Sequence, residues 1–195
     1  MLIRAFGDIP MKVLIIKGKN IILRPMSLRD APKFCEWLGD KEVTQFLNLH
    51  DSNPPTIKEE REYILEQKRK NDTAQFAIAT EGKLIGTVSL MKIHPVHKHA
   101  EYGIFIGDRE YWHQGIGTQA GKMILEYGFR VLRLNKIYLR HVAYNIAGAK
   151  SYKKLGFKKE GVQRQHIRRN GHWHDEPIMS ILKDEFTSRN MKHKT

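Results

Sequence analysis

Apolar and polar residues in the first half of the chain form a pattern that predicts strands joined by tight turns. Apolar runs at 13–16 and 21–23 flank a Lys-Gly-Lys-Asn turn and predict a hairpin. Runs at 75–80 and 84–91 flank Glu-Gly-Lys and predict a second hairpin. The alternating segment 100–106 predicts a further strand.

Two segments before residue 70 carry the start signals of helices. Ser27 with Asp30, and Thr56 with Glu59, each form a capping-box pattern. The apolar face predicted for the first helix, which extends to residue 38, consists of Leu28, Ala31, Phe34, Cys35 and Leu38. We interpret Cys35 as a small core residue. The second helix is highly charged, and its narrow apolar stripe, which includes Ile57, Ile64 and Leu65, predicts a surface position. A polar, proline-containing loop at 48–55 separates the two helices.

The second half of the chain alternates helices with strands. A wide apolar stripe at 118–132 is typical of a helix buried against a sheet. The elements predicted after it are a strand at 136–142, a helix at 147–155 that ends at Gly156, and strands at 157–162 and 173–182. The last two strands are predicted to flank a basic loop at 164–172, and a polar tail follows from Asp184. The whole order predicts an α/β fold, a mixed sheet with helices on both faces.

Length and charge narrow the class of protein. A chain of 195 residues is expected to form one domain, with a core of about 13–186, a short extension at 1–12 and a polar tail at 187–195. Met1 and Met11 are both possible starts. Lys and Arg outnumber Asp and Glu by 34 to 21, a net charge of +13 that favours phosphorylated or otherwise anionic partners. The single cysteine excludes an intrachain disulfide and fits a cytoplasmic location, and no apolar run is long enough to span a membrane.

The stretch from Ala100 to Met123 joins a strand to a helix through a turn that ends in Gly115 and Gly117. Unpaired amides at a helix N-terminus bind anions, and glycine lets a phosphate approach the backbone. The spacing matches neither a dinucleotide fingerprint nor a Walker loop. Three histidines, His94, His97 and His99, lie close together in the preceding turn. No cysteine or carboxylate cluster completes a metal site there, so we expect no metal.

Three motifs resemble a known family. They are YWHQGIGT at 111–118, NIAGAKSYKKLGF at 145–157 and RRNGHWHD at 168–175. In this order they resemble the GNAT superfamily of acetyl-CoA-dependent N-acetyltransferases, and most closely the branch that acetylates ribosomal-protein N-termini and the related spermidine acetyltransferases. The resemblance covers about 21–186. It implies a single GNAT domain over 1–195, with a mostly antiparallel, twisted central sheet.

The resemblance also implies a cofactor site and a general acid. Acetyl-CoA is expected to contact Phe105, Ile106, Trp112, His113, Gln114, Gly115, Ile116, Gly117, Thr118 and Asn145. Trp112 stands where the family usually has Gln or Arg, and Asn145 is expected to contact the cofactor, cap the following helix, or both. Gly103 is expected to mark a bulge or a close approach. Tyr152 matches the family's general acid, with a core aromatic as the alternative role.

The general base is left open. Glu101 is a candidate for taking a proton through water, and a surface salt bridge is an equal alternative. His99 and His141 are further candidates. No base is needed if the acceptor binds as a neutral N-terminal amine, whose pKa is only ~8.

The first interpretation is an N-acetyltransferase of the ribosomal-protein-alanine type, acting on a protein N-terminal amine. The alternative is a small-amine acetyltransferase for a polyamine, an aminoglycoside or an amino sugar. A polyamine enzyme would want an acidic pocket, for which the candidates are Glu36, Asp40, Glu42 and Glu59. A nucleic-acid-binding module and a non-catalytic acyl-CoA sensor are less favoured. No membrane or direct nucleic-acid partner is expected, and a homodimer follows from the resemblance only.

Overall fold

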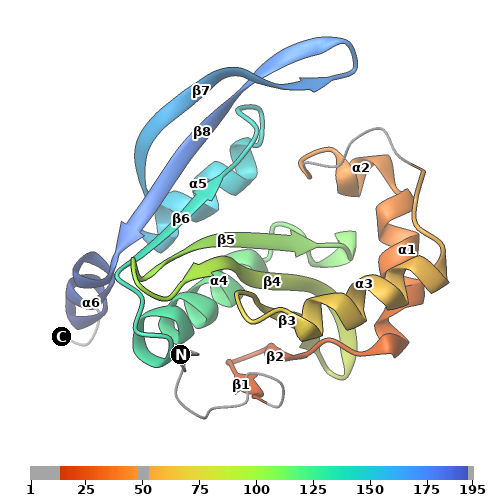
Figure 1. Cartoon of the computed structure of the whole chain (residues 1–195), viewed down its shortest axis with the longest axis horizontal. Coiled ribbons are helices and arrows are strands. Elements are labelled where there is room, and N and C mark those ends of the chain that lie inside the picture. Colours follow the sequence, from red (N-terminus) through yellow and green to blue (C-terminus); the bar gives the residue numbers. More distant parts are fainter. Residues whose placement is uncertain (1–13, 48–52, 193–195) are drawn as a thin grey trace, which may run out of the picture.

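The computed structural model describes residues 14–47 and 53–192, whose described strands form one eight-stranded sheet of order β1-β2-β3-β4-β5-β6-β8-β7 (Figure 1). The strands are β1 (Ile16–Lys17), β2 (Ile22–Pro25), β3 (Ala74–Thr80), β4 (Lys83–His94), β5 (His99–Ile106), β6 (Lys136–Arg140), β7 (Lys158–Arg169) and β8 (His172–Leu182). Among these strands, only β5 and β6 pair in parallel. The structure therefore confirms the predicted mixed, mostly antiparallel sheet.

Helices cover both faces of this sheet. The helices are α1 (Ala31–Gly39), α2 (Lys41–Thr44), α3 (Ile57–Arg69), α4 (Ile116–Glu126), α5 (Ile146–Leu155) and α6 (Lys183–Lys192). Successive residues of a strand point to opposite faces of the sheet, so β3 contributes to the packing on both faces. Phe76 and Ile78 join the larger core, which includes Ile124 of α4 and Leu155 of α5, whereas Ala77 joins a smaller core with α1 and α3.

The predicted capping box at Ser27 is confirmed, but the helix predicted from Ser27 begins as a 3-10 turn at Leu28–Asp30, and part of the buried face of α1 also differs. Both capping boxes form, at Ser27 before the short 3-10 turn that leads into α1 and at Thr56 before α3. Leu28 is exposed and Cys35 is only half-buried. Trp37 is buried in their place, against Phe105 at a ring distance of 5.9 Å. A Cβ on Gly107 would lie 2.0 Å from the Trp37 ring, so this glycine makes the room.

The buried face of α3 also differs from the prediction. Glu60 and Ile64 are buried, whereas Ile57 and Leu65 are exposed. Glu60 was not part of the predicted stripe, yet it is buried near α1, where burial and then the charge of Glu60 raise the pKa of the Cys35 thiol. The predicted loop at 48–55 is described only from residue 53, and the predicted extension at 1–12 lies outside the described residues.

The basic loop predicted at 164–172 is wrong. Strands β7 and β8 run almost to the turn at Asn170 and Gly171, where both residues have positive φ (50° and 78°). The outer part of the hairpin, residues 164–173, is exposed at most positions, so apolar and polar residues do not alternate there and the strand pattern is lost. The tail after Asp184 is helix α6, in which Phe186 packs on Phe129 at a ring distance of 5.2 Å.

Candidate active site

Strands β5 and β6 separate in the middle of the sheet. Their parallel pairing covers only three residue pairs, of which Glu101 with Tyr138 is the last. Beyond this point β5 continues to Ile106 on β4, while β6 continues on β8. The β5 backbone from residue 102 onward therefore has no strand partner on its β6 side. An extended ligand that carries amide groups can pair with such an edge.

The N-terminus of α4 follows the end of β5 after a loop, residues 107–115, that contains a short 3-10 turn at Arg109–Tyr111. Gly115 occupies the N-cap with φ of 78°, and no side chain caps the first amides. No acidic residue lies in the first turn. The first backbone N–H groups and the helix dipole are therefore available to an anion.

Two side chains fix the loop before α4 to its surroundings. The Trp112 indole N–H donates to the carbonyl of Ile106 at 2.9 Å, which ties the loop to the end of β5. The Gln114 amide donates to the carbonyl of Glu110 at 2.5 Å. Thus the residue that departs from the usual family pattern, Trp112, has a structural role through its side chain.

Gly117 and Thr118 complete the first turn of α4. A Cβ on Gly117 would meet only Ile104 Cδ1, at an ordinary 3.8 Å, so the fold itself does not require glycine there. The Thr118 hydroxyl lies 3.0 Å from that of Ser151, which joins α4 to α5. At Gly103, a regular pair with Ser89 excludes a bulge, and a Cβ would lie 3.1 Å from the Ser89 and Met91 side chains.

Helix α5 brings Asn145 and Tyr152 to this region. The Asn145 side chain caps α5 by accepting from the Gly148 N–H at 2.8 Å. Tyr152 is 9% exposed, and its ring lies 6.0 Å from Tyr102 and 5.7 Å from His141. Burial raises the pKa of Tyr152 to about 12. At neutral pH its hydroxyl is therefore protonated and able to donate a proton.

Glu101 lies on the opposite face of β5 from Tyr102. Its carboxylate forms ion pairs with Lys92 at 2.7 Å and with Arg140 at 2.9 Å. Burial alone would raise the pKa of Glu101, but the hydrogen bonds and charges of Lys92 and Arg140 outweigh burial and lower it. A lowered pKa makes the carboxylate a weaker proton acceptor.

Arg140 and Glu176 belong to the same network, although the sequence did not single them out. The Arg140 guanidinium also contacts the Glu176 carboxylate at 3.3 Å, and Glu176 is 3% exposed. Glu101, Arg140 and Glu176 come from three neighbouring strands. The only available signal in the sequence was a charged residue inside each predicted strand.

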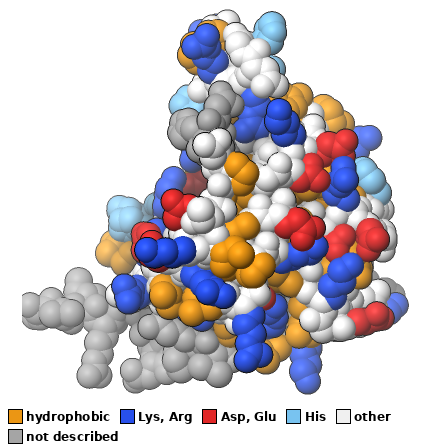
Figure 2. All heavy atoms as spheres, turned by 90° about the vertical axis from the view of Figure 1, so that its right-hand side faces the viewer, with side chains coloured by type: hydrophobic (Ala, Val, Ile, Leu, Met, Phe, Trp, Pro, Cys, Tyr) orange, Lys and Arg blue, Asp and Glu red, His pale blue; other side chains and the backbone are white. Residues whose placement is uncertain are grey.

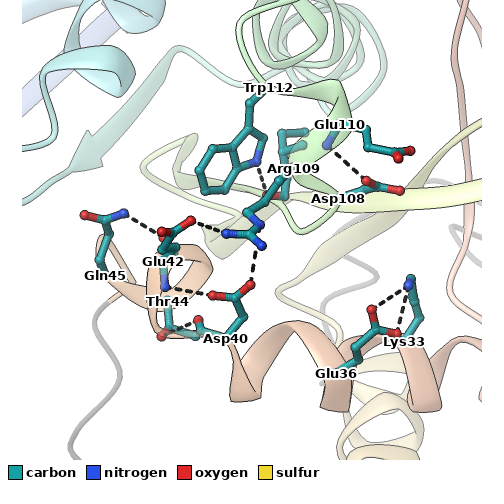
Figure 3. A network of polar contacts seen from close by, with 11 residues as sticks. Lys33, Glu36, Asp40, Glu42, Thr44, Gln45, Asp108, Arg109, Glu110 and Trp112 are labelled. Carbon is teal, nitrogen blue, oxygen red and sulfur yellow. Dashed lines mark hydrogen bonds and ion pairs between the residues drawn. The ribbon is translucent and has the colours of Figure 1, made fainter.

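The four carboxylates predicted as an acidic pocket all have local partners. Arg109 reaches between Asp40, at 3.5 Å, and Glu42, as Figure 3 shows. Glu36 pairs with Lys33 at 2.7 Å, and Glu59 accepts from Thr56 in the capping box. Each of these carboxylates therefore already has a charged or hydrogen-bonding partner.

The rings of the three histidines at and beside the β4–β5 turn lie close together, and those of His94 and His97 stack. The ring of His94 lies 4.3 Å from that of His97 and 5.3 Å from that of His99. Within residues 14–47 and 53–192, no group of three or more His, Cys, Asp or Glu side chains is arranged to hold a metal ion. In the same residues, no helix is long and apolar enough to cross a membrane.

A family model described as an acetyltransferase (GNAT) domain matches residues 20–158. The chain belongs to the GNAT family. It is 31% identical over 176 residues to the probable N-acetyltransferase YjcK of Bacillus subtilis, covering 86% of this chain and 97% of that protein. It is also 35% identical over 121 residues to the spermidine N(1)-acetyltransferase of Escherichia coli, covering 62% and 63%.

Solved structures confirm the GNAT fold. The Vibrio cholerae spermidine N-acetyltransferase in complex with CoA and spermine aligns with a TM-score of 0.80 at 24% identity, over 87% of this chain and 99% of that chain. The RimL α-N-protein acetyltransferase in complex with coenzyme A aligns with a TM-score of 0.79 at 19% identity, over 88% and 99%. The GNAT chain described here is an acetyl-CoA-dependent N-acetyltransferase.

Proposed function

We propose that this GNAT enzyme acetylates the α-amine of a protein N-terminus. The amides of residues 113–118 hold the pyrophosphate of acetyl-CoA at the start of α4. The pantetheine arm lies along the free edge of β5, past Phe105 and Ile106, with Asn145 on the other side. This places the thioester where β5 and β6 separate. The unpaired helix amides and the free strand edge support this placement.

The chemical step forms one bond and breaks one bond. The neutral amine attacks the thioester carbonyl to form the C–N bond, and the C–S bond breaks. Tyr152 donates its proton to the departing thiolate. The nitrogen that attacked the carbonyl loses one proton to water, and the Tyr152 phenolate takes a proton back from water, so that the products are the amide and the free thiol. A buried tyrosine whose pKa is about 12 suits the acid role, since it is fully protonated at neutral pH.

The ion pairs that Glu101 forms with Lys92 and Arg140 are the observation that favours this acceptor. Because Lys92 and Arg140 lower its pKa, Glu101 is poorly suited to deprotonating a strongly basic amine. An N-terminal α-amine has a pKa of ~8, so roughly a quarter of it is neutral at pH 7.5, whereas an amine of pKa ~10.4 is only about 0.1% neutral. The site therefore suits the α-amine. We propose that Glu101 positions Arg140 rather than accepting the proton.

A polyamine acceptor is the second candidate, because a relative 35% identical over 121 residues is a spermidine N(1)-acetyltransferase. The positive charge of this chain disfavours a polyamine acceptor. The net charge is +13, and the acidic residues nearest to α2 already pair with Arg109. A polycation could pair with these carboxylates only by displacing Arg109 from them.

The test measures thiol release from acetyl-CoA with peptides that begin with Ala, Ser or Met, with spermidine, with an aminoglycoside and with an amino sugar. We expect turnover on one or more of the peptides and little on the other amines. Turnover on spermidine alone would refute the proposed acceptor and leave the cofactor site intact. The same peptide with an acetylated N-terminus and a free Lys side chain is the control, because only the α-amine is removed.

A further inference from the structure

The β4–β5 turn, residues 94–99, joins β5 to the start of β6. The Lys98 carbonyl accepts hydrogen bonds from the backbone N–H groups of Asn135 at 2.7 Å and Lys136 at 3.1 Å. The next residue, His99, forms with Lys136 the first of the three residue pairs between β5 and β6. Figure 1 shows the turn beside the beginning of β6. The place where β5 and β6 separate therefore depends on a short run of contacts that starts at this turn.

The surroundings of two histidines in this turn fit a neutral imidazole ring. The Nδ1 atom of His94 accepts a hydrogen bond from the backbone N–H of His97 at 3.0 Å. The Nδ1 atom of His99 is buried and has no hydrogen-bond partner among the described residues. Both nitrogens of a protonated imidazole are donors. Protonation would therefore break the contact at His94 and would leave a buried, unpaired N–H at His99.

The rings of the turn also repel one another once they are charged. The centroid of the His97 ring lies 4.3 Å from that of His94 and 6.2 Å from that of His99. Burial, followed by the charges of His94, His97 and Lys136, lowers the pKa of His99. The folded turn therefore binds this proton less readily than the unfolded chain does. Its stability is present above about pH 6.5 and is lost as the pH falls below that value.

The carboxylates around the turn are engaged with other groups. The charged and titratable residues on the neighbouring elements are Asp72, Lys92, Lys98, Glu101, Arg133, Lys136, Tyr138, Glu160 and Lys183. Glu101 pairs with Lys92 and Arg140, and Glu160 pairs with Lys136. The Asp72 carboxylate accepts from the Thr73 hydroxyl at 3.2 Å. Within the described part of the chain, a histidine–carboxylate pair joins His166 to Glu176, and none involves this turn.

We infer that the β4–β5 turn is an acid-sensitive latch on the active site. When His94 and His99 take up protons, the turn rearranges to give the new N–H groups acceptors and to separate the rings. This rearrangement releases the Lys98 carbonyl from β6 and loosens the three residue pairs between β5 and β6. The site where the two strands separate is then poorly formed, so activity falls reversibly as the pH drops below about 6.5. The latch does not depend on which amine is the acceptor.

The first test compares hydrogen exchange of single backbone amides in the wild type at pH 7.5 and 5.5. Protection is corrected for the effect of pH on exchange itself, and the β2–β3 pairs serve as the internal reference. Each proton gained on opening raises the open fraction up to about tenfold per pH unit. At 98–101 and 135–138 we expect protection to fall at least about tenfold at pH 5.5 and to recover at pH 7.5. An equal fall in the β2–β3 pairs would indicate global unfolding and would refute the latch.

The second test removes both protonation sites with the double variant His94→Asn/His99→Phe. The Asn side-chain oxygen can accept from the His97 N–H, and a Phe ring can keep the contact with Tyr138, whose ring lies 5.9 Å from that of His99. We expect most of the acid-dependent loss of protection to disappear. The ratio of thiol release at pH 5.5 to that at pH 7.5 should exceed the wild-type ratio several-fold, because titration of the acceptor amine is the same in both proteins.

An undiminished loss of protection in this double variant would refute the latch. If the double variant fails to fold, His94→Asn alone replaces it. This single variant should remove part of the loss, because one of the two protonation sites remains, and an undiminished loss would again contradict the inference.

The matched control makes the same two changes in the β7–β8 hairpin, as His172→Asn/His174→Phe. His172 is exposed, and the ring of His174 lies 4.8 Å from that of Tyr144. Figure 2 shows basic and histidine side chains at the surface of the molecule where this hairpin projects. The loss of protection at the β4–β5 turn should remain as in the wild type. An equal rescue by the control would show that the loss follows from the total number of histidines, and would refute the latch.

Discussion

At the scale of single residues, the acid role of Tyr152 can be tested without disturbing the fold. Tyr152→Phe removes one oxygen from a ring that packs on Tyr102, His141 and Phe157. Since general acid catalysis contributes roughly 10²–10⁴-fold, we expect kcat to fall about 100-fold or more. The Kd for acetyl-CoA should change little. Stopped-flow thiol release and calorimetry measure the two quantities.

Tyr102→Phe is the control for Tyr152→Phe. Tyr102 is the neighbouring buried phenol, and its hydroxyl has no hydrogen-bond partner among the described residues. It should leave kcat within a few-fold of the wild type. Unchanged turnover in Tyr152→Phe would remove Tyr152 from the mechanism. In the wild type, no loss of activity due to Tyr152 is expected up to about pH 10, because its pKa is about 12.

The buried Glu60 side chain is expected to lower the stability of the protein as the pH rises. The side chain is 5% exposed on α3, and burial raises its pKa from 4.5 to about 7. Between these values the unfolded chain loses the proton and the folded chain keeps it, so stability falls as pH rises and the full penalty applies above about 7. We expect Glu60→Gln to be more stable than the wild type at pH 8.5 by roughly 1–2 kcal/mol, and to gain little at pH 4.5.

Thermal unfolding at the two pH values measures this difference. Glu62→Gln removes the same charge from an exposed position of the same helix, and it should change the melting temperature equally little at both pH values. A gain for Glu60→Gln that is equal at pH 4.5 and 8.5 would show that proton binding by Glu60 is not its cause.

At the scale of elements, the first turn of α4 is predicted to bind acetyl-CoA through its backbone. The first turn has room for a side chain at Gly117, where a Cβ would lie 3.8 Å from Ile104. Gly117→Glu places a carboxylate beside the unpaired amides, where it competes with and repels the pyrophosphate. We expect the Kd for acetyl-CoA to rise at least tenfold while the melting temperature stays within a few degrees.

The control variant lowers the net charge by the same amount as Gly117→Glu, but at a position further along α4. Lys122→Gln also lowers the net charge by one, at an exposed position of α4 beyond the first turn. Its Kd should stay within twofold of the wild type. If Gly117→Glu binds acetyl-CoA as tightly as Lys122→Gln does, the cofactor lies elsewhere.

Elements with local signals were predictable from the sequence, and those that depend on remote partners were not. The two capping boxes and the end of α5 at Gly156 each depend on residues within one turn, and all three are confirmed. The burial of Trp37 depends on Gly107 and Phe105, far along the chain, so helical periodicity identified Ala31 and Phe34 as buried but missed Trp37. The outer part of the β7–β8 hairpin was missed because most residues at 164–173 are exposed and show no alternation.

The same distinction applies to the candidate site. The glycine loop and Tyr152 were found through short motifs, and their roles stay predictions. Arg169 belongs to the RRNGHWHD motif but was given no role, and Arg140 was not singled out, because their contacts join residues 39 and up to 125 positions apart. In each case, a charged residue in a strand has no identifiable partner until the order of the strands is known.

At the scale of the whole molecule, the net charge of +13 predicts which acceptors associate fastest. Opposite charges attract over a distance of about 10 Å at 0.1 M salt, and the attraction weakens as salt rises. Between two peptides that share the same first four residues, the one with acidic residues further along should have a KM several-fold lower than the one with basic residues. Raising the salt from 0.05 to 0.5 M should remove most of this difference, while kcat stays similar because the reacting amine is the same. A lower KM for the basic peptide would instead indicate a local acidic surface near the acceptor entrance and would favour the polyamine alternative.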